Sequence, residues 1–241
     1  MKIALAQTKS VKGNIPANII AHQRFIDLAV KAGALAVFFP ELSLTGYEPA
    51  LANELALELN DSRLDPFDAI SLKHNITIGF GAPIRTGTGV QIAMLFFQPG
   101  KPREIYSKQQ LHSDEMPFFE AGSKNLVFEL GDKKLVPAIC YESLQNDNAD
   151  MAKQLGAEIY LASVAKAQTG IERGNVHYPQ IATRLSVPLL MVNCVGLCDN
   201  FLSVGGSGVW TRDGLVGRLG ATEEGLLVFD TEREDLVQVD M

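Results

Sequence analysis

Hydrophobic positions recur with two different periods along the chain, and the change of period distinguishes helices from strands. Residues 2–7 (KIALAQ) predict a strand, and Asn14 with Pro16 provides a cap and a first-turn residue for a helix over 16–32. The continuous apolar run at 35–39 (LAVFF) predicts a strand that is buried on both faces. The same order of helix and apolar strand recurs at 152–162 and 181–193. This order is typical of α/β domains with parallel strands.

Between these units, apolar runs separated by short polar turns predict hairpins. The turns lie at 86–89, 131–132 and 212–214. Short helices are predicted over 62–74, where Ser62 and Asp65 resemble a capping box, and over 147–155. No linker, charge block or low-complexity stretch marks a boundary, so the sequence predicts a single α/β domain over 1–241, with helices layered on mixed sheets.

Composition narrows the class of protein and its partners. The net charge of −7 has the wrong sign for binding a phosphate backbone or an anionic membrane, so neither a nucleic acid nor a membrane partner is expected. The longest apolar runs are far shorter than the roughly 20 residues that a bilayer span needs. The opening MKIALAQTKS is too short for a signal peptide. We therefore expect a cytoplasmic protein.

The cysteines and glycines argue against a bound metal or nucleotide. The three cysteines, Cys140, Cys194 and Cys198, are too few and odd in number for a disulfide framework, which favours reduced thiols. No histidine stands at metal-ligand spacing from Cys194 and Cys198, so these two are predicted to be buried thiols. The glycines at 205, 206 and 208 precede a strand rather than a helix and form no dinucleotide fingerprint. We expect neither a metal nor a cofactor.

Reactive residues stand at predicted strand ends. Cys140 follows the apolar strand KKLVPAI and Glu41 follows LAVFF, so both are placed where an α/β sheet forms its ligand crevice. We expect the two strand ends to meet at the edge of one sheet. Lys108 follows the strand-like run REIYS, and Glu115 lies in the loop beyond it.

These residue types make chemical sense together. A thiol has a pKa of about 8.5 and needs a proton acceptor or a cation to become a nucleophile, roles that Glu41 and Lys108 can fill. When the sulfur adds to an amide or nitrile carbon, Lys108 and the Tyr141 N–H are suitable donors for the developing negative charge. Glu115 can help to keep a buried Lys108 charged.

Two other interpretations of the same residues stay open. Cys140 alone is compatible with an inert packed thiol, and Glu115 with a surface carboxylate. A Cys-His pair that uses His177 or His112 is the main catalytic rival. The remaining histidines, His22 and His74, lie in helical patterns and are predicted to be surface residues.

Three blocks in order resemble the motifs of the nitrilase superfamily, also called carbon-nitrogen hydrolases. The blocks are FPELSLTGY at 39–47, the segment K-Q-Q-L-H…E-x-x-x-F-x-x-G from Lys108 to Gly122, and AICYE at 138–142. The opening strand and the late segment from 205 to 230 are also similar. The resemblance implies a four-layer αββα sandwich with two mixed β-sheets, and a homodimer or a higher homo-oligomer.

The resemblance also implies roles for residues. Glu41 becomes the general base, Lys108 the oxyanion stabiliser and Cys140 the nucleophile, with Glu115 at the second-glutamate position. Candidate substrate-binding residues, which adjoin these four or follow the next strand, are Tyr47, Phe119, Tyr141 and Lys166. An aromatic residue is common in the family where this chain has Lys166, and a lysine there favours a substrate with a carboxylate.

The leading functional hypothesis is a cofactor-independent hydrolase of a non-peptide C–N bond. Its substrate would be the amide or carbamoyl group of a small metabolite, cleaved through a cysteine thioester; the resemblance favours amides over nitriles. The same thioester could instead pass its acyl group to an amine, and the protein would then be an acyltransferase. From a different class, the chain could be a metabolite-binding protein without catalysis.

Overall fold

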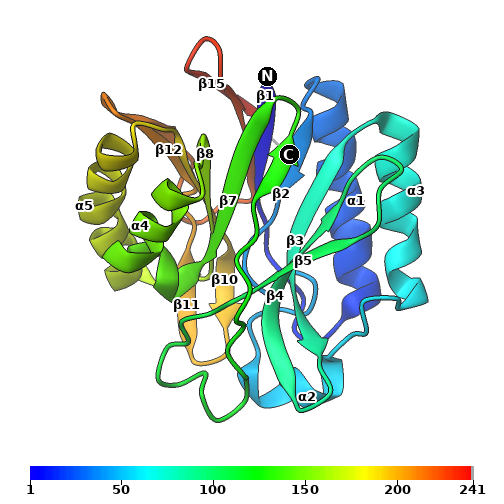
Figure 1. Cartoon of the computed structure of the whole chain (residues 1–241). Helices are drawn as coiled ribbons and strands as arrows, with labels where there is room; N and C mark the ends of the chain where they lie inside the picture. The colour runs from blue at the N-terminus through cyan, green and yellow to red at the C-terminus, as the bar shows by residue number, and fades with distance from the viewer. Residues whose placement is uncertain (240–241) are drawn as a thin grey trace.

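Two β-sheets packed face to face form the centre of the molecule (Figure 1). The computed structural model describes residues 1–239. In spatial order, the first sheet contains β15 (Asp235–Val239), β14 (Gly225–Asp230), β1 (Lys2–Gln7), β2 (Ala36–Phe38), β3 (Thr77–Arg85), β4 (Val90–Phe97) and β5 (Glu104–Ser107). The second contains β13 (Gly214–Arg218), β12 (Gly208–Thr211), β9 (Leu189–Asn193), β8 (Ile159–Val164), β7 (Lys133–Ile139) and β6 (Phe128–Leu130).

Both sheets are mixed, with parallel strands at their centres. β1, β2 and β3 pair in parallel, as do β7, β8 and β9, whereas the outer strands pair antiparallel with their neighbours. The predicted hairpins β3–β4, β6–β7 and β12–β13 are confirmed. A further hairpin, β10 (Val195–Cys198) with β11 (Phe201–Val204), was not predicted.

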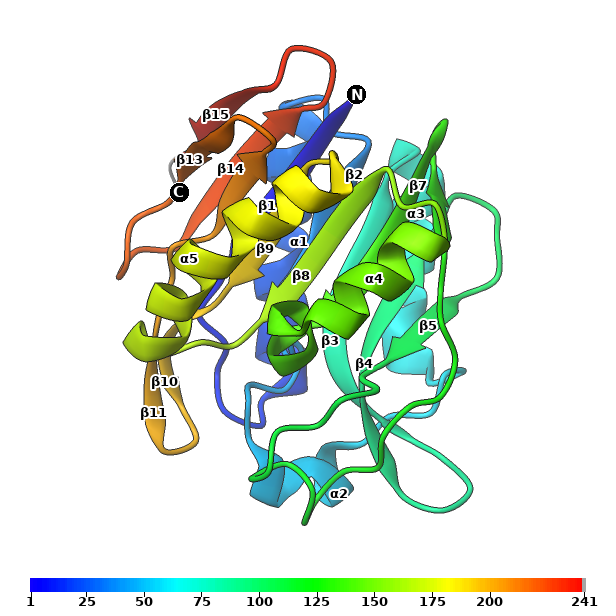
Figure 2. The same ribbon diagram turned by 60° about the vertical axis from the view of Figure 1, so that its left-hand side comes forward.

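Helices cover the outer face of each sheet (Figure 2). The first sheet carries α1 (Ile15–Lys31) and α3 (Asp65–His74), and the second carries α4 (Asn146–Gln154) and α5 (Gln168–Leu185). The short elements are η1 (Pro49–Leu51), α2 (Ala52–Leu55), η2 (Ser62–Leu64) and η3 (Cys140–Leu144). The order of layers is therefore helix, sheet, sheet, helix, and the expected four-layer αββα sandwich is confirmed. None of the helices described is long and apolar enough to cross a membrane.

The hydrophobic core lies in three layers because each central strand buries both of its faces. On β2, Ala36 and Phe38 face the second sheet, while Val37 packs toward the helices. A third cluster lies between the second sheet and its helices and includes Tyr178 and Trp210. The continuous apolar run that predicted a doubly buried strand corresponds to this arrangement.

Two local predictions were wrong. Asp61, rather than Ser62, caps the turn before α3, since its side chain accepts a hydrogen bond from the Arg63 N–H at 2.9 Å. His22 is not a surface residue: it is buried on the inner face of α1, and its Nε2 lies 3.0 Å from Ser43 Oγ. Burial lowers the pKa of His22 to about 4, so the ring is neutral at pH 7.

Candidate active site

Glu41 lies in a tight turn directly after β2. Leu42 adopts a left-handed backbone conformation, with φ of 51°. The turn packs so closely on β3 that a Cβ at Gly81 would lie 2.2 Å from the Leu42 backbone nitrogen. The absence of a side chain at Gly81 therefore allows the Glu41 turn to lie against the sheet.

Cys140 stands at the end of β7, where the strand passes into the 3-10 helix η3. Its φ of 46° is unusual for a residue with a side chain, and it turns the half-buried thiol away from the strand. The Sγ lies 3.6 Å from the Ala165 carbonyl oxygen.

Glu41 and Cys140 were expected at the edge of one sheet, and this was wrong. Glu41 follows β2 of the first sheet, and Cys140 follows β7 of the second. The two sheets face each other, and Ser163 Oγ of β8 donates a hydrogen bond across them to the Phe39 carbonyl at 2.9 Å. The strand ends therefore meet between the sheets, which is an arrangement that a single-sheet argument cannot predict.

Lys108 connects the two glutamates. Its Nζ lies 2.7 Å from Glu41 Oε1 and 2.6 Å from Glu115 Oε1, and its side chain is 0% exposed. Both carboxylates are equally inaccessible. A buried ammonium between two buried carboxylates is held in place by charge-assisted hydrogen bonds in a site of low dielectric.

Glu115 is itself held from two sides. The Tyr47 hydroxyl donates to its Oε1 at 2.8 Å, and the His112 backbone N–H donates to its Oε2 at 2.8 Å. Glu41 has no such second support, because its Oε2 is buried without a hydrogen-bond partner among the described residues. That oxygen is available to receive a proton.

Burial sets the proton affinities of the cluster. It raises the pKa of Glu41 to about 7, an effect that Lys108 opposes and Glu115 reinforces. Burial also raises the pKa of Cys140 to about 11, so the sulfur is a thiol at rest. Burial lowers the pKa of Lys108, but the surrounding negative groups, led by Glu41, raise it above its ordinary value. At neutral pH the cluster holds a charged lysine and a carboxylate poised between its two forms.

Sequence reasoning missed Glu142, which joins the segment of Cys140 to the segment of Lys108. Its buried carboxylate accepts hydrogen bonds from the Ile139 N–H at 2.7 Å, just before Cys140, and from the Gln109 N–H at 2.9 Å, just after Lys108. The Tyr106 hydroxyl, on β5, donates to the same carboxylate at 2.7 Å. An acidic residue two positions after the cysteine was visible in AICYE, but only the fold shows which backbone groups it binds.

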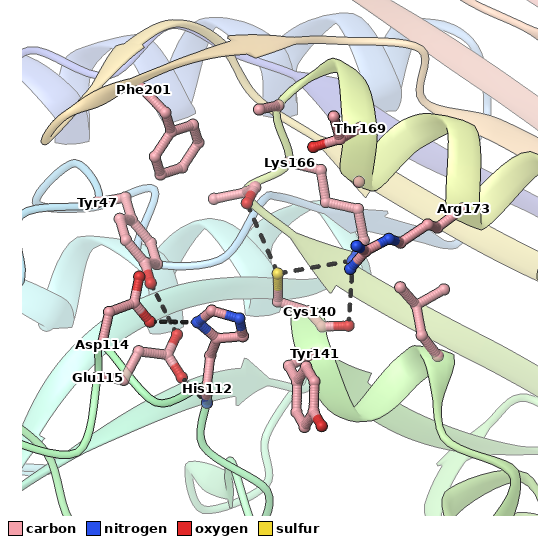
Figure 3. Close-up of a pocket in the computed structure, with 14 residues that line it drawn as sticks. Tyr47, His112, Asp114, Glu115, Cys140, Tyr141, Lys166, Thr169, Arg173 and Phe201 are labelled. Carbon is pink, nitrogen blue, oxygen red and sulfur yellow. Dashed lines mark hydrogen bonds and ion pairs between the residues drawn. The ribbon is translucent and has the colours of Figure 1, made fainter.

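A cavity of about 210 Å³ opens above the sulfur (Figure 3). The residues that line it are Tyr47, His112, Asp114, Glu115, Cys140, Tyr141, Leu144, Ala165, Lys166, Ala167, Thr169, Gly170, Arg173 and Phe201. Its size suits a small metabolite. The wall formed by the start of α5 and by Phe201 of β11 was not predicted.

The candidate substrate-binding residues divide into two groups. Tyr47, Tyr141 and Lys166 lie on the cavity wall. Phe119 does not: it is buried in the core between the sheets and contributes packing. Lys166 is 5% exposed, and its Nζ lies 3.8 Å from Cys140 Sγ.

Neither rival histidine is a hydrogen-bond partner of Cys140 within residues 1–239. His112 lies on the cavity wall, where its Nδ1 is 2.5 Å from Asp114 Oδ1. His177 lies on α5, and burial together with Lys166 lowers its pKa. The charged groups that act on the pKa of the sulfur include Glu41, Lys108 and Lys166, and Lys166 Nζ lies 3.8 Å from it.

Cys194 and Cys198 form a pair of buried free thiols with their sulfurs 3.6 Å apart. Across the described part of the chain, no group of three or more His, Cys, Asp or Glu side chains is placed to hold a metal ion.

Comparison with known proteins agrees with this geometry. A family model described as carbon-nitrogen hydrolase matches residues 2–240. The chain belongs to the carbon-nitrogen hydrolase family. This is the family that the three sequence blocks indicated.

Curated relatives and solved structures are similar to this chain at low sequence identity. The glutamine-dependent NAD(+) synthetases of Acinetobacter baylyi and Rhodobacter capsulatus are each 28% identical, over 89% and 96% of this chain. The chain spans only 41% and 44% of their lengths. The NitN amidase from Nesterenkonia sp. AN1 is 24% identical with a TM-score of 0.87, covering 95% of this chain and 92% of that one.

A further structure of that Nesterenkonia amidase carries acrylamide added at its active-site cysteine. It has a TM-score of 0.87 and 23% identity, and covers 95% of this chain and 92% of that one. At this sequence identity, the structural similarity shows a shared fold.

Proposed function

We propose that the protein hydrolyses the amide or carbamoyl group of a small metabolite through a thioester on Cys140. The observation that carries this proposal is Lys108, an ammonium with no exposed surface, held between Glu41 and Glu115 beside the cavity that contains the sulfur. A buried cation in this position is suited to stabilising an oxyanion where water is excluded.

The first half of the reaction transfers the acyl group to sulfur. Glu41 takes the thiol proton, and the sulfur attacks the amide carbon to form a tetrahedral intermediate. Lys108 and the Tyr141 N–H, at the start of η3, hold its negative oxygen. Glu41 then returns the proton to the departing nitrogen, which leaves as ammonia or an amine, and the thioester remains.

The second half restores the enzyme. A water molecule takes the place of the leaving group and gives a proton to Glu41 as its oxygen attacks the thioester carbon. The same two donors hold the second oxyanion. When the C–S bond breaks, the proton on Glu41 returns to the sulfur and the carboxylic acid departs. No step needs a metal or an organic cofactor.

The test is to incubate the protein with a mixture of small amides and to look by intact mass for an acyl adduct on Cys140. We expect an adduct that is lost in Cys140→Ala and retained in Cys194→Ala, because Cys194 is a buried thiol outside this cavity. Wild-type and Cys140→Ala protein that behave alike toward every amide would overturn the proposal and favour a binding protein without catalysis.

Glutamine is a second substrate to test, since the relatives in Acinetobacter and Rhodobacter are named for their dependence on it. A competing amine in the same assay separates hydrolysis from acyl transfer. Formation of the free acid supports the hydrolase, and formation of the N-acylated amine supports an acyltransferase.

We propose further that the protein acts in the cytoplasm as a homodimer or higher homo-oligomer. The cysteine usage supports a reducing compartment. Cell fractionation tests the first statement. Light scattering coupled to size exclusion tests the second, and a mass equal to one chain would refute it.

A further inference from the structure

Lys166 is held rigidly beside the sulfur. Its backbone N–H donates to Asn193 Oδ1 at 2.8 Å, and its carbonyl accepts from Ser203 Oγ at 3.1 Å. The side chain is almost wholly buried and reaches over Cys140, as Figure 3 shows. Its Nζ lies 3.4 Å from the Cys140 carbonyl oxygen and 3.8 Å from Sγ.

Lys166 differs from Lys108 in its counter-charge. Lys108 forms ion pairs with two carboxylates, whereas no carboxylate in residues 1–239 lies within ion-pair distance of Lys166. A buried ammonium is costly unless an anion compensates it. Within residues 1–239, the hydrogen-bond partners of Nζ are the Cys140 carbonyl oxygen and sulfur, and of these two only the sulfur can become an anion. The Tyr178 hydroxyl also faces Lys166, but burial raises the pKa of that phenol and keeps it neutral.

We propose that Lys166 is a second catalytic cation, whose role is to stabilise the thiolate of Cys140. Lys108 is then left to serve the oxyanion. This inference rests on the proposed role of Cys140 as nucleophile, but it concerns the formation of the nucleophile and is independent of the substrate.

The proton balance is simple. The proton leaves Sγ for the Glu41 carboxylate, and Lys166 stays an ammonium throughout. While the sulfur is negative, Nζ donates to it. When the thioester forms, the sulfur becomes neutral and Nζ keeps its contact with the Cys140 carbonyl.

Other charged groups act on Lys166 and Cys140, and the test must separate their effects on the thiolate from that of Lys166. Cys140 faces Glu41, which disfavours the thiolate, and Lys108, which favours it together with Lys166. Glu115 adds a further negative charge. Tyr178, on α5, faces Lys166 and also Cys140. Replacing Lys166 alone leaves these groups in place.

The experiment measures how fast iodoacetamide alkylates Cys140 between pH 6 and pH 9, followed by intact mass. An opposite charge at this range lowers a pKa by about one to three pH units, so its removal reduces the thiolate fraction of Cys140. The thiolate that remains has a higher pKa and is more nucleophilic, which partly offsets the loss. We therefore expect Lys166→Met to react about 3- to 30-fold more slowly than wild type at each pH. Lys166→Arg keeps the charge and should recover most of the rate, which a purely structural role would not explain.

Controls separate the possible outcomes. Lys153→Met removes an exposed lysine from α4 and should react like wild type. Iodoacetate is run beside iodoacetamide. If Lys166 instead binds a carboxylate of the substrate, only the iodoacetate rate falls in Lys166→Met, and that result overturns the proposal.

The outcome is distinguishable from failure of the proposed function. Alkylation needs no substrate, so slower alkylation in Lys166→Met supports the inference even in a protein that cleaves no amide offered. An unchanged iodoacetamide rate in an active Lys166→Met enzyme refutes the role of Lys166 and leaves the hydrolase proposal intact.

Discussion

The hydrogen bond from Tyr47 to Glu115 offers a quantitative test of the catalytic cluster. The hydroxyl is a buried donor 2.8 Å from Glu115 Oε1, the same oxygen that Lys108 contacts at 2.6 Å. Burial raises the pKa of Tyr47, so the group is a neutral donor at all working pH values. Tyr47→Phe removes the donor and keeps the ring.

The size of the effect follows from the charge of the acceptor. A hydrogen bond to a charged group contributes about 1.5–3 kcal/mol, and a domain of this length loses about 2–4 °C of melting temperature per kcal/mol. We expect Tyr47→Phe to lower the free energy of unfolding by about 1.5–3 kcal/mol and the melting temperature by about 3–12 °C. Glu115 keeps its contacts with Lys108 and the His112 N–H, so the fold should persist.

The assay is urea unfolding at pH 7 beside the rate of acylation of Cys140. The matched control is Tyr160→Phe, which removes a buried hydroxyl that donates to the neutral Asn148 Oδ1 at 2.7 Å, outside the cavity. That bond contributes about 0.5–1.5 kcal/mol, and its loss should leave acylation unchanged. If the two variants lose equal stability and both react like wild type, the account of Glu115 as a charged, supported member of the cluster is wrong.

Two further predictions concern the carboxylates and the turn that carries one of them. Glu115→Gln removes a negative charge that helps to raise the pKa of Glu41. The acid limb of the pH profile of kcat/KM, expected near pH 7, should therefore move to lower pH. An acid limb that keeps its pH or moves to higher pH contradicts this. Gly81→Ala places a methyl group against backbone atoms of the Glu41 turn and should cost about 3 kcal/mol in urea unfolding. Gly87→Ala, where a Cβ meets nothing within 4 Å, should be nearly neutral, and equal stability of the two variants would refute the steric argument.

Periodicity and turn residues predicted the local elements well, because those signals are local. The helix over 16–32 and the strand over 2–7 correspond to α1 and β1. His22 was misplaced because its residue type was given more weight than its position: it lies on the same inner face of the helix as Phe25 and Ile26.

Long-range features could be predicted only through resemblance to a family. Strand patterns placed Glu41 and Cys140 at strand ends, but nothing in a linear sequence shows that the ends belong to two facing sheets. The hydrogen bonds of Glu142 and the place of Arg173 on the cavity wall were missed for the same reason. Glu142 binds the Gln109 N–H, which is 33 residues away, and Arg173 lines the cavity where α5 contacts η3.

The proposed catalytic groups are divided between two sheets, so the proposed reaction depends on contact between the layers. Glu41 and Lys108 belong to the first sheet and its loops, while Cys140 and Lys166 belong to the second. Neither sheet alone contains both the proposed base, Glu41, and the proposed nucleophile, Cys140. Any partially unfolded form in which the sheets separate must be inert, even if each sheet keeps its own hydrogen bonds. Loss of activity in denaturant thus reports separation of the layers. An intermediate that keeps its strands but has separated layers would retain secondary structure and show no hydrolysis.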